Sequence, residues 1–125
     1  MNIEEKELKI NQKIRQVSLA QELKSREIRE LEDLEADYFS THQQEQRYYQ
    51  ELISNNSGSK YVNHFIELDE EANHLHQIER QRLEDIAERL VDEEVALQIK
   101  EDDLYNERKQ LFSDPEETEE SNSWV

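Results

Sequence analysis

The feature of this chain that most restricts its fold is the near absence of residues that favour turns. Its 125 residues include one glycine, Gly58, and one proline, Pro115. Compact folds with many loops need such residues at their turns. The only cluster of turn residues is the segment 54–59. We therefore expect a chain that reverses its direction once, between two long helices.

Apolar residues recur at seven-residue intervals on both sides of this cluster, which is typical of the seam of a coiled coil. The ladder before the cluster is Ile3, Ile10, Val17, Leu31, Tyr38 and Leu52, with Ile14, Ile28 and Tyr49 at intermediate positions; the ladder after it is Leu83, Leu90, Leu97, Leu104 and Leu111. We predict an all-α fold, a long antiparallel two-helix hairpin over 1–113. Its helices cover about 3–53 and about 60–112, with the turn at 54–59.

The two ladders also predict which residues face each other. Facing positions in an antiparallel hairpin have residue numbers with a constant sum, and here the sum is 114, as in Val17 with Leu97. The same register pairs Ile28 with Ile86 and places the reversal at Ser57, inside the turn cluster. Agreement between two ladders and one turn is the strongest support that the sequence gives for this fold.

Polar residues interrupt the predicted seam at three levels, where they lower stability and fix the register. Lys24 is expected to face Leu90, with its aliphatic stem packed and its ammonium group in solvent. Tyr38 is expected to face His76, which we interpret either as a surface residue or as a residue packed on Tyr38. Glu45 is expected to face Asp69, which predicts weak packing near the turn.

Composition restricts the classes of partner. A formal net charge of −17 argues against binding to nucleic acid and to anionic membrane surfaces. No apolar run is long enough to insert into a membrane, and no signal peptide is recognised at the N-terminus. The absence of cysteine fits a cytoplasmic protein. Export by a route that uses no leader peptide stays open.

The sequence shows no pattern typical of an enzyme. One glycine is too few for a phosphate-binding loop, and there is no cysteine nucleophile. Glu71 and His74 match half of a di-iron site on a helix, but three-residue patterns of this kind are common in chains rich in Glu. We interpret both as surface residues and expect no catalytic residue, no cofactor and no metal.

The chain carries more apolar residues than one seam uses. Leu8, Leu19 and Leu23 lie off the first ladder, and Val91, Val95 and Ile99 form a second stripe on the second helix. The register places Leu19 level with Val95. This apolar surface either widens the contact within the hairpin, joins two copies in a four-helix bundle, or binds a different helical protein.

Aromatic residues near the turn, Phe39 and Tyr48 among them, either pack there or recognise a partner. The predicted partner-binding residues are Leu8, Leu19, Leu23, Val91, Val95, Ile99, Phe39 and Tyr48.

The last segment, 114–125, has the composition of a disordered acidic tail. It contains Trp124, the only tryptophan of the chain. This residue is either part of a free tail or a docking motif, and the terminal carboxylate of Val125 suits capture by a partner.

Three runs in the first helix carry a resemblance to a known family. They are Ile10-Asn-Gln-Lys-Ile-Arg-Gln-Val17, the run from Arg29 to Phe39, and the run from Gln44 to Leu52. Over about 7–52 the chain resembles the small helical proteins that accompany LXG-domain toxins, which are substrates of type VII secretion in Gram-positive bacteria. The second helix is compatible with this family and adds no motif of its own.

The resemblance implies a non-catalytic chaperone or adaptor. Such a protein binds the helical N-terminal LXG domain of its toxin, often beside a second small partner related to the WXG proteins, and supports export, with or without leaving the cell itself.

The chain departs from the WXG pattern, because its turn reads Asn55-Asn-Ser-Gly58 instead of Trp-x-Gly. An aromatic residue followed four residues later by an acid, the spacing of the WXG export signal, occurs at Phe112 with Glu116 and at Phe65 with Asp69. The first pair includes Pro115 and the second lies beside the turn. The alternative to the chaperone is a self-associating coiled-coil scaffold.

Overall fold

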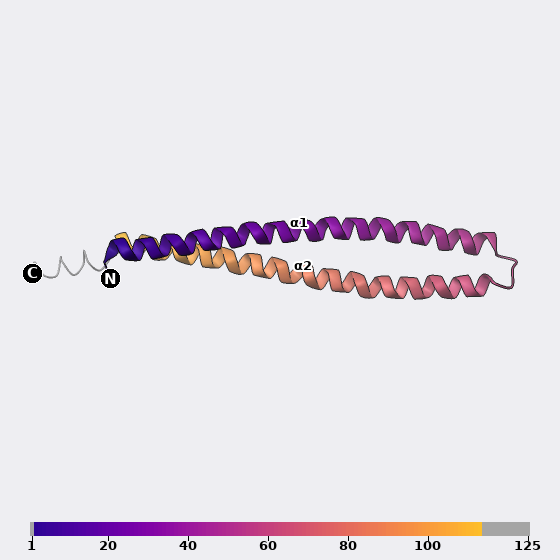
Figure 1. Cartoon of the computed structure of the whole chain (residues 1–125). Helices are drawn as coiled ribbons and strands as arrows, with labels where there is room; N and C mark the ends of the chain where they lie inside the picture. Colours follow the sequence, from indigo (N-terminus) through magenta and orange to yellow (C-terminus); the bar gives the residue numbers. More distant parts are fainter. Residues whose placement is uncertain (1, 114–125) are drawn as a thin grey trace, which may run out of the picture. The chain divides into compact units, whose positions relative to one another are not determined.

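The structure, a computed structural model, describes residues 2–113. This part of the chain consists of two helices, α1 (Ile3–Asn55) and α2 (Val62–Phe112), and contains no strand (Figure 1). The predicted all-α fold, a hairpin of two long helices, is confirmed. The tail predicted over 114–125, with Trp124, lies outside the described residues. Neither helix has a segment within 2–113 that is apolar and long enough to cross a membrane.

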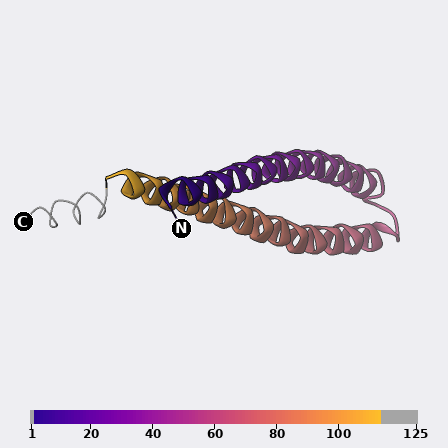
Figure 2. The same ribbon diagram turned by 60° about the vertical axis from the view of Figure 1, so that its left-hand side comes forward.

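Each helix contributes to two compact units. Unit 1 is Met1–Arg26 with Val91–Val125, of which 2–26 and 91–113 are described, and unit 2 is Glu27–Leu90. In unit 1 the first part of α1 lies beside the last part of α2 (Figures 1 and 2). Unit 2 contains the turn between the helices. The two units are described separately below.

Unit 1 is an antiparallel helix pair with a small apolar core. Near the start of α1, Asn11 Oδ1 accepts a hydrogen bond from Arg108 Nη1 near the end of α2, at 3.0 Å. Further along α1, the Lys24 ammonium group forms an ion pair with Glu93 of α2. The buried side chains are Ile10, Val17 and Leu104. The expectation that Lys24 extends its ammonium group into solvent is therefore wrong, because a carboxylate lies within its reach on the other helix.

In unit 2 one contact between the helices, Tyr38 with His76, has the predicted sum of 114, and two others have larger sums, 119 for Gln46 with Asn73 and 121 for Glu45 with His76. Tyr38 contacts His76, as the constant sum predicts. Glu45, which was expected to face Asp69, instead accepts a hydrogen bond from His76. Ile86, the expected partner of Ile28, is 36% exposed. The half-buried residue at this level of α2 is the next one, Ala87.

Most of the half-buried and buried side chains of α1 recur at alternating spacings of three and four residues, which average to the 3.5-residue repeat of a coiled coil. In unit 1 these positions are Ile3, Glu7, Ile10, Ile14, Val17, Gln21 and Lys24; in unit 2 they are Ile28, Leu31, Glu35, Tyr38, His42, Glu45, Tyr49 and Leu52. Asn11, Ala20, Gln46 and Ile53 are half-buried as well and lie next to this series. Several positions of the series are polar, and three of them, Lys24, Tyr38 and Glu45, contact polar side chains of α2.

The ends of the helices are set by local hydrogen bonds. Asn2 Oδ1 accepts a hydrogen bond from the backbone N–H of Glu5 at 2.8 Å and so caps the start of α1. At the turn, Ser59 Oγ accepts one from the backbone N–H of Tyr61 at 3.1 Å. This contact holds Lys60 and Tyr61 in the turn, and α2 begins at Val62, two residues later than the sequence suggested.

Candidate protein-binding surfaces

All eight residues predicted to bind a partner have exposed side chains. Their exposed fractions lie between 49% for Val91 and 60% for Leu8. Unit 1 contains Leu8, Leu19, Leu23, Val91, Val95 and Ile99, and unit 2 contains Phe39 and Tyr48. The apolar stripes off the seam thus do not widen the contact between the helices. Whether they bind a partner stays a prediction.

A groove of about 400 Å³ lies beside Val95 in unit 1. Its lining is largely uncharged and consists of Gln21, Ser25, Glu94, Val95 and Gln98. Residues seven apart lie on the same side of a coiled coil, so Val91, seven residues before Gln98, lies on this side as well. We call this surface the Val95 groove. It has the combination of apolar side chains and uncharged polar groups that is common at protein interfaces.

A second surface of unit 1, which we call the lysine groove, has four ammonium groups along its rim. It comprises two adjoining hollows of about 400 Å³ each that share Lys13. Lys6 and Lys9 line the first with Glu107 and Gln110, and Lys100 lines the second with Gln16 and Ala20. The floor is apolar and is formed by Ile10, Val17, Leu97, Leu104 and Leu111.

The two grooves lie on opposite sides of the helix pair. Gln16 of the lysine groove and Ser25 of the Val95 groove are nine residues apart, which is about half a turn around α1. Leu23 follows Gln16 by seven residues and so lies on the side of the lysine groove. The apolar residues that the sequence places at one level, Leu23 and Val91, therefore do not form one continuous patch.

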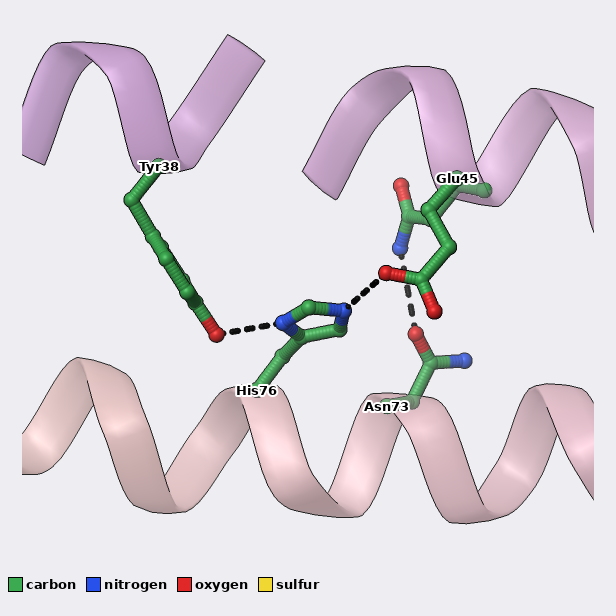
Figure 3. A network of polar contacts seen from close by, with 5 residues as sticks. Tyr38, Glu45, Asn73 and His76 are labelled. Atoms are coloured by element: carbon green, nitrogen blue, oxygen red, sulfur yellow. Dashed lines mark hydrogen bonds and ion pairs between the residues drawn. The ribbon is translucent and has the colours of Figure 1, made fainter. Parts of the chain in front are cut away.

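Unit 2 contains a chain of hydrogen bonds between the helices (Figure 3). The Tyr38 hydroxyl donates to His76 Nδ1, and His76 Nε2 donates to Glu45 Oε2 at 2.7 Å. The two rings meet edge to face, with 5.4 Å between centroids, so His76 packs on Tyr38 and the interpretation of His76 as a surface residue is wrong, because the hydroxyl and the ring of Tyr38 lie within its reach. One neutral tautomer of His76 satisfies both hydrogen bonds. Next to this chain, Gln46 Nε2 donates to Asn73 Oδ1 at 3.3 Å.

His42 extends this polar cluster toward a hollow of about 210 Å³. Its ring lies on the ring of His76, with 3.8 Å between centroids. His42 Nε2 is buried and has no hydrogen-bond partner. The hollow is lined by His42 and Tyr38 together with Glu35, Phe39, Arg80, Leu83 and Glu84. The sequence pattern identified Tyr38 and His76 but not His42, because a histidine at a seam position gives no signal of which ring it will contact.

The Tyr38 hydroxyl is held in its protonated form. Burial, and then the carboxylates of Glu79 and Glu45, raise the pKa of Tyr38 above its usual value near 10, while Arg80 acts in the opposite direction. The Tyr38 hydroxyl therefore keeps its proton throughout the neutral range.

This raised pKa predicts a decline of stability in alkali. A group whose pKa is higher in the folded state contributes its full stability below the unfolded-state pKa and loses it as pH rises through the folded value. The free energy of unfolding should therefore fall more steeply above about pH 10 in wild type than in Tyr38→Phe. Urea titrations at several pH values between 8 and 11 measure this. Tyr61→Phe, at an exposed position of the turn, is the control, and equal slopes for all three proteins would refute the assignment.

The residues that resemble half of a di-iron site have exposed side chains, since Glu71 and His74 are both on the outer surface of α2. Within residues 2–113, no three His, Cys, Asp or Glu side chains are placed to hold a metal ion together.

The chain was compared with protein-family models, curated proteins and solved structures. No family model matches this chain, and no match was found among curated proteins or among solved structures.

Proposed function

We propose that this chain is a non-catalytic chaperone or adaptor that binds the helical N-terminal domain of an LXG toxin and supports its export by type VII secretion. It acts in the cytoplasm of the producing cell, alone or with a second small WXG-like protein. The identity of the toxin domain rests on the resemblance of about 7–52 to LXG-associated proteins. The mode of binding rests on the surface of unit 1.

The observation that carries this proposal is the amount of apolar surface that unit 1 exposes. Three side chains form its buried core, Ile10, Val17 and Leu104, whereas eight large apolar side chains of its described residues are exposed. Covering a half-exposed Val, Leu or Ile contributes about 1 kcal/mol. Val91 and Val95 lie beside a groove that can receive side chains from a third helix, so the Val95 groove is the proposed contact with the toxin domain.

Substitutions on opposite sides of unit 1 test this assignment. We expect Val95→Glu to weaken binding of the LXG domain at least tenfold, because a carboxylate would be buried against an apolar helix. Leu23→Glu, on the other side, should have a smaller effect. Leu75→Glu is the matched control, since Leu75 is 61% exposed and belongs to unit 2. Affinities would be measured by calorimetry with the LXG domain of a candidate toxin, chosen from the neighbouring genes. Undiminished binding by Val95→Glu would exclude the Val95 groove, and no binding by wild type would exclude the proposed partner.

Self-association into a scaffold is the second candidate, and the distribution of charge favours it in one respect. Residues 2–26 carry six basic and four acidic side chains. Residues 91–113 carry three basic and seven acidic side chains. The described part of unit 1 therefore has a net charge of only −2. Two copies could therefore meet through unit 1 without strong repulsion. Light scattering on the purified chain distinguishes the candidates: a stable dimer that Val95→Glu dissociates favours the scaffold.

A further inference from the structure

We propose that the lysine groove of unit 1 binds an acidic peptide segment, and that its occupant is the acidic end of this same chain, residues 114–125. This contact is independent of the proposed function, because the Val95 groove lies on the opposite side of the helix pair.

The groove concentrates positive charge on a strongly acidic chain. Lys6, Lys9 and Lys13 follow one another at spacings of three and four residues on α1, and Lys100 joins them from α2. All four side chains are exposed. Within 2–113 none of the four forms an ion pair, and Glu107 is the only acid in the lining. Like charges at these spacings repel one another along a helix. An anionic occupant would remove this repulsion.

The end of the chain has the charge to be that occupant. Residues 114–125 contain five acidic side chains and no basic one: Asp114, Glu116, Glu117, Glu119 and Glu120. The segment also contains Trp124, and the apolar floor of the groove can receive an aromatic ring between the lysine stems. Ion pairs between the lysine ammonium groups and the Glu carboxylates of this segment do not require one fixed geometry.

Position and length also allow the contact. Arg108 of α2 is hydrogen-bonded to Asn11 of α1, so the last turns of α2 lie beside the part of α1 that carries the first lysines. From Lys6 to Ala20 the groove extends about 21 Å along α1. Twelve residues can extend up to about 40 Å. The segment can therefore leave α2 at Ser113, turn back and follow the whole groove.

Carbodiimide cross-linking of the full-length chain tests the contact directly, because it joins only ammonium and carboxylate groups that touch. We expect bonds from Lys6, Lys9 or Lys13 to Glu116–Glu120, found by mass spectrometry. Mixing ¹⁵N-labelled and unlabelled protein separates bonds within one chain from bonds between two. Absence of these bonds, or bonds mainly between labelled and unlabelled copies, would overturn the proposal.

Trp124 provides a second readout, since it is the only tryptophan. We expect its fluorescence anisotropy to fall when salt is raised from about 20 mM to 0.5 M, because screening weakens exposed ion pairs. The variant Lys6→Glu/Lys9→Glu/Lys13→Glu should show the low value already at 20 mM. The variant Arg29→Glu/Arg47→Glu/Lys60→Glu makes the same change of net charge in unit 2 and should behave as wild type. Circular dichroism verifies that both variants are helical. Equal anisotropy for all three proteins at both salt concentrations would also overturn the proposal.

Discussion

Replacing Leu104 by alanine should lower the free energy of unfolding by about 2–4 kcal/mol, one of the two largest effects that we expect. Leu104 is 6% exposed and is one of three buried side chains in the described part of unit 1. A core of three cannot repack around the lost atoms as a larger core can. Alanine is the best helix former, so the loss reports on packing and not on helix propensity.

The matched control for Leu104→Ala is Ile99→Ala, on the same helix and in the same unit. Ile99 is 56% exposed, so its truncation should change stability by less than about 0.5 kcal/mol. Urea unfolding followed by circular dichroism at 222 nm measures both variants. If Ile99→Ala were as destabilising as Leu104→Ala, Ile99 would be covered in solution, for instance by a second copy of the chain.

Replacing Glu45 and His76 together by leucine should stabilise unit 2 by about 1–3 kcal/mol. The chain of hydrogen bonds through Tyr38, His76 and Glu45 occupies positions that apolar residues would fill in a simple coiled coil. Substituting well-packed apolar residues for a partly buried polar pair is often stabilising. His76→Leu alone should be less stable than the double variant, because it leaves the Glu45 carboxylate without its donor.

The same double variant should lose specificity as it gains stability. Polar seam residues fix the register and the number of helices, since other arrangements leave them unpaired. We therefore expect larger species in light scattering for Glu45→Leu/His76→Leu and not for wild type. A double variant that is less stable than wild type would mean that the polar cluster contributes net stability, contrary to this interpretation.

Much of the fold follows from the spacing of apolar residues. The seven-residue ladders and the lone turn cluster predict two helices, and the constant sum predicts that Tyr38 meets His76. The ion pair of Lys24 with Glu93 was not predicted, because a long side chain can reach residues several positions from the one that it faces. Likewise, Glu45 reaches His76 instead of facing Asp69.

The candidate surfaces were predicted only in part, for a geometric reason. A sum of residue numbers gives the level of two residues along a helix pair but not the side on which each lies. Leu23 and Val91 are therefore level in the sequence pattern and yet belong to opposite sides of unit 1. The lysine groove was not recognised, since Lys6, Lys9 and Lys13 resemble an ordinary solvated face until the structure adds Lys100 from α2.

The alternating three-and-four spacing of the half-buried positions along α1 restricts how relatives of this chain can vary in length. One inserted residue would rotate every later side chain by about 100° and move polar groups into the seam. Only insertions of whole heptads, matched on both helices, would preserve the contacts. The segment between Asn55 and Val62 escapes this restriction: an added Cβ at Gly58 would meet no atom within 4 Å, and no glycine of the described residues has a positive φ. Insertions and deletions among homologues should accordingly accumulate there.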